Sequence, residues 1–221
     1  MAQSSYTDTK FFTEDDLRLL HDYGDKDPTL ISEADIIADK LSEGVWAKTK
    51  EWSSLVVVTG FCAECRRSVK KQAGRTAKQA DGRSYMRRVF RPYSWAKLYR
   101  PSEKLYGVFF TLGVDGKSQS LMWKLDCKRT GKNALAPQLI RRFDEYVHHN
   151  VPIARRTVPA QELKQYDWKK LSEETYQFIL DNLPHYEAAL AYTWQGSKPE
   201  AIGTRKMKSP DSFAELGLSN G

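Results

Sequence analysis

The chain has 221 residues, of which 40% are hydrophobic and 12% aromatic, a composition that supports a folded core and excludes a disordered chain. No apolar run approaches the roughly 18 residues that a membrane-spanning helix needs, and the N-terminus lacks the basic and apolar pattern of a secretory signal. Three cysteines are an odd number and do not make a disulfide framework. We therefore expect a cytoplasmic protein without membrane contact.

The net charge of +7 is concentrated in one segment of the chain. Residues 1–60 carry 6 basic and 12 acidic side chains, residues 61–104 carry 13 and 3, and residues 105–221 carry 16 and 13. A focused positive charge attracts polyanions better than a diffuse one, so the middle segment predicts a polyanion-binding surface. The alternative is a basic surface that only keeps the protein soluble.

Residues 1–60 are expected to form a helical N-terminal unit. Thr13 and Asp16 have the spacing of a capping box, which predicts the start of a first helix, and Gly24 is a typical helix end. A second helix is predicted from Ser32, because apolar residues then recur at helical spacing as far as Trp52. Gly44 lies inside this second helix and should bend or divide it.

The middle of the chain contains the clearest strand pattern. Residues 64–84 are strongly basic with few large apolar side chains, which fits either a helix with a solvated face or a loop that orders on a partner. Residues 108–114 and 121–127 each alternate at period two, and Asp115 and Gly116 have turn chemistry, so together they predict a β-hairpin.

Helices are again predicted in the last third of the chain. Residues 135–150 and 166–183 carry apolar residues at helical spacing, and a further helix should start after Pro184, which is favourable at a first turn. The composition of residues 196–221 is typical of a flexible tail. These elements predict an α+β fold. It would have a small, mainly antiparallel sheet with a central hairpin and flanking helices, forming a single α+β domain over residues 1–195.

Two motifs suggest metal chemistry, and both have ordinary structural alternatives. Cys62 and Cys65 have the spacing of half a zinc site, but no second such pair follows, and buried apolar cysteines are the alternative. Asp126 and Lys128 fit the last part of a Mg²⁺-dependent nuclease motif. Asp115, at the far end of the hairpin, would be on the order of 25–30 Å away, so another acid such as Glu51 or Glu64 would be needed.

The segment from Arg87 to Gly107 combines basic and aromatic residues. Lysine and arginine hold phosphates, and flat rings beside them are typical of sites that stack on bases. Tyr93, Trp95 and Tyr99 share one face if the segment is extended, although Trp95 and Tyr99 could instead anchor the segment to the core. The candidate DNA-contacting residues are Arg66, Arg67, Lys70, Lys71, Arg87, Arg88, Arg91, Tyr93, Trp95, Lys97, Tyr99, Arg100 and Trp123.

The pattern YSWAKLYRP, LYGVFFTLGVDG, LMWKLDCKR, FDEYV and YDWKKLSEETYQFI resembles the DNA-recognition module of bacterial modification-dependent restriction proteins of the McrB kind, over roughly residues 85–195. The resemblance implies recognition of base-modified double-stranded DNA in an antiviral defence system. It also implies a partner subunit or domain that is a motor or a nuclease, because this chain has no phosphate-cradling motor motif of its own.

Three functions follow as hypotheses. The first is a non-catalytic DNA-binding module that needs no cofactor or metal, holds the backbone with residues 66–104 and stacks bases on Tyr93, Trp95 and Trp123. The second is a Mg²⁺-dependent nuclease that uses Asp126 and Lys128. The third is an adaptor whose basic surface meets an acidic protein.

Overall fold

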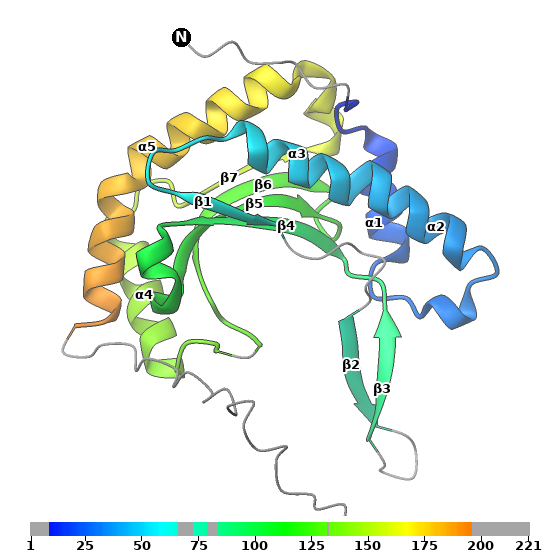
Figure 1. Ribbon diagram of the computed structural model, residues 1–221, viewed down its shortest axis with the longest axis horizontal. Helices are drawn as coiled ribbons and strands as arrows, with labels where there is room; N and C mark the ends of the chain where they lie inside the picture. The colour runs from blue at the N-terminus through cyan, green and yellow to red at the C-terminus, as the bar shows by residue number, and fades with distance from the viewer. Residues whose placement is uncertain (1–8, 66–72, 79–83, 132, 196–221) are drawn as a thin grey trace, which may run out of the picture.

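A five-stranded antiparallel sheet in the order β1-β4-β5-β6-β7 organises the chain (Figure 1). The computed structural model describes residues 9–65, 73–78, 84–131 and 133–195. The strands of the sheet are β1 (Cys62–Cys65), β4 (Tyr93–Tyr99), β5 (Val108–Asp115), β6 (Ser120–Cys127) and β7 (Arg155–Pro159). The α+β prediction is therefore confirmed, although the sequence patterns had not indicated the short edge strands β1 and β7.

The predicted hairpin is the centre of this sheet. Its strands β5 and β6 pair from Val108 opposite Cys127 to Asp115 opposite Ser120. Alternation places one set of side chains on each face, and the helices cover the face that carries Phe110 and Trp123, both buried.

Two of the three N-terminal helices and the C-terminal helix account for that cover. Helix α1 (Glu14–Tyr23) starts with the predicted capping box and ends at Gly24. The second predicted helix is divided around Gly44 into α2 (Ala34–Leu41), a π-helical turn (Ser42–Trp46) and α3 (Ala47–Leu55). Its cap is not Ser32, since α2 begins after Glu33 without a side-chain cap. In Figure 1, α3 lies across the convex side of the sheet.

The C-terminal part of the chain contains α4 (Pro137–Asn150) and one long helix, α5 (Trp168–Thr193). Two separate helices divided at Pro184 were predicted, and this prediction was wrong because Pro184 lies inside α5. The buried face of α5 continues past the proline through Tyr186 and Ala189, so packing against the sheet and α3 offsets the lost hydrogen bond. Among the described residues, no helix is both long and apolar enough to cross a membrane.

A separate two-stranded ribbon, β2 (Ala73–Lys78) and β3 (Ser84–Val89), leaves the sheet between β1 and β4. The basic stretch 64–84 was expected to be a helix or a loop. That expectation was wrong for residues 64–65, 73–78 and 84, which lie in β1, β2 and β3, because antiparallel pairing supplies their backbone hydrogen bonds. Residues 66–72, 79–83 and the expected tail, 196–221, lie outside the described residues.

Candidate nucleic-acid interface

The sheet has a second face, opposite the one covered by α1, α3 and α5, which we call the basic face. The register of β4 to β7 places residues from all four strands on it. They are Tyr93, Trp95, Lys97 and Tyr99 of β4, Phe109, Thr111 and Gly113 of β5, Met122, Lys124 and Asp126 of β6, and Arg155 and Thr157 of β7. This face is concave, and α4 and the β2–β3 ribbon extend beside it at opposite ends of the sheet (Figure 1).

A row of cations crosses the basic face at right angles to the strands. Lys97 is opposite Thr111, Thr111 is opposite Lys124, and Lys124 is opposite Arg155. With about 4.8 Å between neighbouring strands, Lys97 and Arg155 start about 14 Å apart. Arg155 is exposed, and Lys97 and Lys124 are half-buried. The ammonium of Lys97 lies over the ring of Phe109, 3.6 Å from its centroid, and Lys124 pairs with Asp126 at 3.0 Å. The exposed Arg155 is therefore the cation of this row that is most available for a phosphate.

An aromatic pair lies next to this row. The rings of Tyr93 and Trp95 stack with centroids 4.5 Å apart and an interplanar angle of 29°. The ammonium of Lys124 lies over the Trp95 ring, 5.5 Å from its centroid. The predicted common face of Tyr93 and Trp95 is confirmed, and the pair forms a half-buried aromatic platform beside cations.

Gly113 allows the indole of Trp95 to lie across β5. The two residues are opposite each other in the register, and a Cβ at position 113 would lie 2.8 Å from Cδ1 of Trp95 and 2.0 Å from the backbone oxygen of Ser94. No side chain fits there, so the ring occupies the space instead. A tryptophan that covers a cross-strand glycine is a recognised way to fill such a gap.

The indole Nε1 of Trp95 is a buried donor that has no acceptor among the described residues. Buried polar groups are nearly always hydrogen-bonded, and one that is not calls for an explanation such as a water or ligand site. Since Trp95 borders the cation row, a ligand bound there would have an unused donor available.

Asp126 is held in a way that argues against a metal-binding role. Its carboxylate is nearly buried, with 5% of the residue exposed. It accepts hydrogen bonds from Thr111 at 3.3 Å and from the amide of Cys127 at 2.9 Å, and it pairs with Lys124 at 3.0 Å. Among the described residues, no group of three possible metal-ligating side chains comes together. The carboxylate therefore stabilises Lys124 in the cation row.

Two aromatic residues that were predicted to stack on bases have other roles. Trp123 is 2% exposed, and its ring packs edge-on against Trp52 on the helical face, 5.8 Å away. It cannot offer a ring to a base, because it faces the core. Tyr99 is 7% exposed, and its hydroxyl donates a 2.6 Å hydrogen bond to Glu64.

Tyr99, Glu64 and Lys104 form a small polar cluster at the β1 edge. Burial, together with the hydrogen bond to Glu64, raises the pKa of Tyr99 to about 12. Hydrogen bonds from Lys104 and from Tyr99 lower the pKa of Glu64 below its ordinary value of 4.5. Lys104 is thus paired with a carboxylate at 2.8 Å, which reduces its value for phosphate contact.

Arg100 is also used inside the molecule. Its guanidinium pairs with Glu187 of α5 and lies 3.5 Å from Glu103. The hydrogen bond to Glu187 is the main cause of a raised pKa of Arg100, and the negative charges of Glu103 and Glu187 raise it further. The predicted phosphate contact by Arg100 would have to compete with two carboxylates, so its main role is to tie the end of β4 to α5.

The remaining candidates divide by position. Arg91 is half-buried and lies two residues before the start of β4. Arg87 and Arg88 are placed in β3 by their backbone only. Arg66, Arg67, Lys70 and Lys71 lie outside the described residues.

The cysteine pair does not form a compact site. Cys62 and Cys65 are on strand β1, where residues three apart are about 10 Å apart and point to opposite faces. Cysteines joined in a disulfide have Cα atoms within about 7 Å, so this pair does not meet that geometry. Burial raises the pKa of Cys65 to about 11 and that of Cys127 to about 12, as expected for packed, unreactive thiols.

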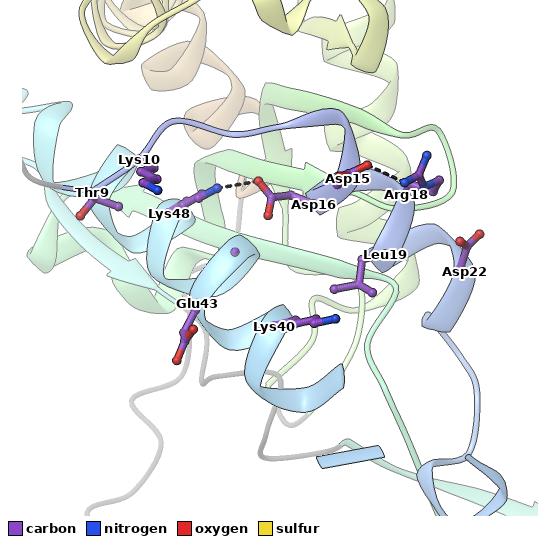
Figure 2. Close-up of a pocket in the computed structure, with 11 residues that line it drawn as sticks. Thr9, Lys10, Asp15, Asp16, Arg18, Leu19, Asp22, Lys40, Glu43 and Lys48 are labelled. Atoms are coloured by element: carbon purple, nitrogen blue, oxygen red, sulfur yellow. Dashed lines mark hydrogen bonds and ion pairs between the residues drawn. The ribbon is translucent and has the colours of Figure 1, made fainter. Parts of the chain in front are cut away.

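A pocket of about 610 Å³ lies on the helical side of the molecule, between α1 and the α2–α3 turn (Figure 2). Its charged lining is balanced and consists of the basic Lys10, Arg18, Lys40 and Lys48 and the acidic Asp15, Asp16, Asp22 and Glu43. A balanced lining gives no net attraction for a polyanion. The pocket is therefore a poorer candidate for nucleic acid than the basic face.

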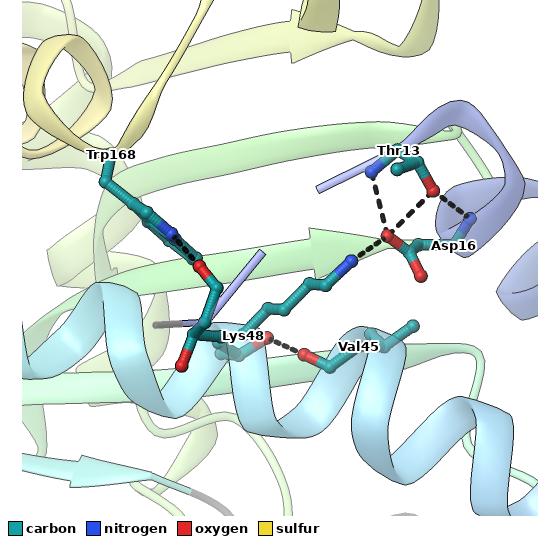
Figure 3. A network of polar contacts seen from close by, with 7 residues as sticks. Thr13, Asp16, Val45, Lys48 and Trp168 are labelled. Carbon is teal, nitrogen blue, oxygen red and sulfur yellow. Dashed lines mark hydrogen bonds and ion pairs between the residues drawn. The ribbon is translucent and has the colours of Figure 1, made fainter. Parts of the chain in front are cut away.

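The wall of this pocket is held by a nearly buried ion pair (Figure 3). Lys48, 8% exposed, donates to Oδ2 of Asp16 at 2.6 Å, and the same oxygen accepts from the amide and hydroxyl of Thr13 at 2.8 and 2.9 Å. Gly44 leaves room for Asp16, since a Cβ there would lie 2.3 Å from Oδ1. This network joins α1 to α3 and is structural.

Sequence reasoning missed two residues of the cation row, Lys124 and Arg155. Lys124 could have been found, because the hairpin register already places it on the face opposite Trp123. Arg155 could not, since β7 was not predicted.

Comparisons of the chain with protein-family models, with curated proteins and with solved structures found no match.

Proposed function

We propose that the chain is a DNA-binding module that holds double-stranded DNA on its basic face. The observation that carries the proposal is the row of Lys97, Lys124 and Arg155 beside the stacked Tyr93–Trp95 pair. Cations in a row supply phosphate contacts without sequence information, and the aromatic platform, with an unused indole donor, supplies a surface for a base.

The resemblance to modification-dependent restriction modules adds a finer proposal, that the DNA is base-modified and that a motor or nuclease partner acts on it. The nuclease alternative is less favoured, because Asp126 is neutralised by Lys124 and Arg129. An acidic protein as partner remains the competing explanation for the basic face.

A binding titration against salt tests the proposal. Fluorescence anisotropy of a labelled duplex should show an affinity that falls steeply with salt, with a log–log slope of about −5 for five or six phosphates. A slope near zero would contradict DNA binding through cations. Plain, methylated and hydroxymethylated duplexes in parallel test the finer proposal, which equal affinities would refute without affecting DNA binding itself.

A further inference from the structure

Strand β7 is an edge of the main sheet and pairs with β6 alone among the described strands (Figure 1). In an antiparallel pair, successive residues direct their backbone groups alternately toward the partner strand and away from it. The oxygen of Ala154 accepts from the amide of Leu125 at 3.0 Å, and the amide of Ala160 donates to the oxygen of Gln119 at 3.0 Å. The even-numbered residues of this stretch therefore bond to β6, and the odd-numbered ones point away from it.

The outer side of β7 offers backbone groups for a further strand. Arg155 and Thr157 are exposed, and in the described part of the chain their outward amides and oxygens meet no other strand and form no other backbone hydrogen bond. Unpaired groups along a sheet edge are a template for another chain. Pro159 has no N–H to donate, so the pairing surface ends there.

The side chains of β7 carry positive charge on both faces of this edge. Arg155 is on the basic face, and Arg156, opposite Trp123, is on the helical face. Both arginines are exposed, and neither forms an ion pair with a described residue. Charged side chains and proline protect an edge against unselective pairing. They oppose a second copy of this chain in particular, because antiparallel pairing centred on Thr157 would put the two Arg156 side chains at diagonal positions within reach of each other.

A small pocket of about 140 Å³ lies between the start of β7 and α5, and its lining consists of Pro152, Ile153, Arg156, Phe178, Asp181, Asn182 and His185. Small-molecule sites are roughly 300–1,000 Å³, so this pocket suits one side chain and not a whole ligand. Asp181 already accepts a hydrogen bond from Gln177 at 2.7 Å, whereas Arg156 has no carboxylate partner. Peptides that add a strand to a sheet obtain their specificity from pockets of this kind.

We propose that β7 pairs antiparallel with an extended acidic segment of a partner protein, which places an acidic side chain against Arg156 at this pocket. Residues of the segment opposite Arg155 and Thr157 would form the hydrogen bonds, and those opposite Arg156 and Val158 would not. Acidic residues should therefore alternate with uncharged ones, and the uncharged ones lie opposite Arg155. Arg155 stays available to phosphates on the basic face, so this inference goes beyond the proposed function and does not depend on it.

Two N-methylated peptides test the backbone pairing without altering the protein. The probe is a short labelled peptide of alternating threonine and glutamate, and fluorescence anisotropy follows its binding to the full chain. N-methylation of the threonines removes the N–H groups that would face β7, whereas N-methylation of the glutamates removes those on the far side. The first change should weaken binding roughly tenfold or more, because several hydrogen bonds are lost together, and the second should have a much smaller effect.

Substitutions on the two faces of β7 test the side-chain assignment. Arg156→Gln should weaken binding of the threonine–glutamate probe roughly two- to fivefold, as expected for an exposed ion pair. Arg155→Gln removes the same charge on the other face and should have little effect. Thr157→Pro should abolish binding and leave the fold intact, because its nitrogen faces away from β6 and proline is tolerated at such edge positions.

The outcomes that would overturn the inference are distinct from those that bear on DNA. No binding of the threonine–glutamate probe, equal binding of a threonine–lysine peptide, or a reversed order of the two N-methylated peptides would each contradict an acidic strand against Arg156. A dimer of the unaltered protein that Thr157→Pro dissociates would show that the occupant is a second copy. None of these measurements contains DNA, so the salt titration of duplex binding decides the proposed function separately.

Discussion

On its helical face the sheet presents Leu98, Phe110 and Trp123, all buried under α1, α3 and α5. On its basic face the same three strands present Lys97, Thr111 and Lys124. The two sets differ by one residue in register, and that shift changes a hydrophobic layer into a row of polar and cationic side chains. Burial on the helical side gives the fold its stability. On the basic face Thr111 and Met122 are buried as well, so the proposed recognition surface consists of the partly exposed Lys97 and Lys124 and the exposed Arg155.

The largest expected effect is a loss of folding stability, which should be greater for the tryptophan of the helical face, Trp123, than for Trp95 on the basic face. Trp123→Ala should cost about 3–5 kcal/mol of stability, because it empties a packed core site and removes one of the two edge-to-face partners of Trp52. Chemical denaturation measures this loss. A loss below 1 kcal/mol would contradict its core position, and the DNA affinity of the folded fraction should not change.

A smaller loss of stability is expected from a substitution at Gly113, which lies opposite Trp95 on the basic face. Gly113→Ala places a Cβ 2.0 Å from the Ser94 oxygen, so β4 and β5 must move apart, at a cost of about 1–3 kcal/mol typical of overpacking. The fluorescence of the tryptophans should shift as Trp95 is displaced. Gly60→Ala is the control, because a Cβ there has no neighbour within 4 Å and the substitution changes only the backbone preference at a positive φ.

Trp95→Ala should act on binding more than on folding. Base–aromatic stacking contributes about 1–3 kcal/mol per base, so duplex affinity should fall roughly 5- to 150-fold, with a smaller effect on melting temperature than Trp123→Ala has. Trp46→Ala is the control, since Trp46 is also half-buried with a lysine over its ring but belongs to the helical side. Equal losses of affinity in both variants would remove the case for an aromatic platform.

The smallest effect concerns the edge of the sheet. Because its contacts lower the pKa of Glu64 below 4.5, Glu64 adds stability that is present above that pH and is lost as the pH falls through its folded-state pKa. Glu64→Gln should therefore cost at most about 1 kcal/mol at pH 7, and the difference should vanish once the pH falls below the folded-state pKa of Glu64. Glu145→Gln, on the exposed side of α4, is the control for the loss of one carboxylate outside this cluster.

Local patterns predicted the elements that local chemistry determines. The capping box at Thr13 and the hairpin around Asp115 were confirmed, because their signals lie within a few residues. Strands β1 and β7 were missed since they are short and carry few apolar side chains, so only pairing with β4 and β6 makes them strands. Pro184 was misjudged because helix α5 is stabilised by distant packing.

The candidate site was predicted only in part, because some of its contacts come from segments that are distant in the sequence. Alternation along β4 correctly put Tyr93 and Trp95 on one side, but it could not show that Glu64 and Glu187, from β1 and α5, would pair with Tyr99 and Arg100. Trp123 was assigned to the wrong surface although its own strand pattern placed it with Leu121 and Leu125 in the apolar set.

The most direct test of the account is the salt dependence of duplex binding in two charge-matched variants. Lys97→Gln/Arg155→Gln removes the two ends of the cation row and leaves the Lys124–Asp126 ion pair intact, whereas Lys10→Gln/Lys40→Gln removes the same charge at the pocket on the helical side. Each lost phosphate contact reduces the log–log slope by about 0.9, so the first variant should be flatter by about 1.8 and the second unchanged. Equal slopes in the two variants would contradict a DNA-binding basic face.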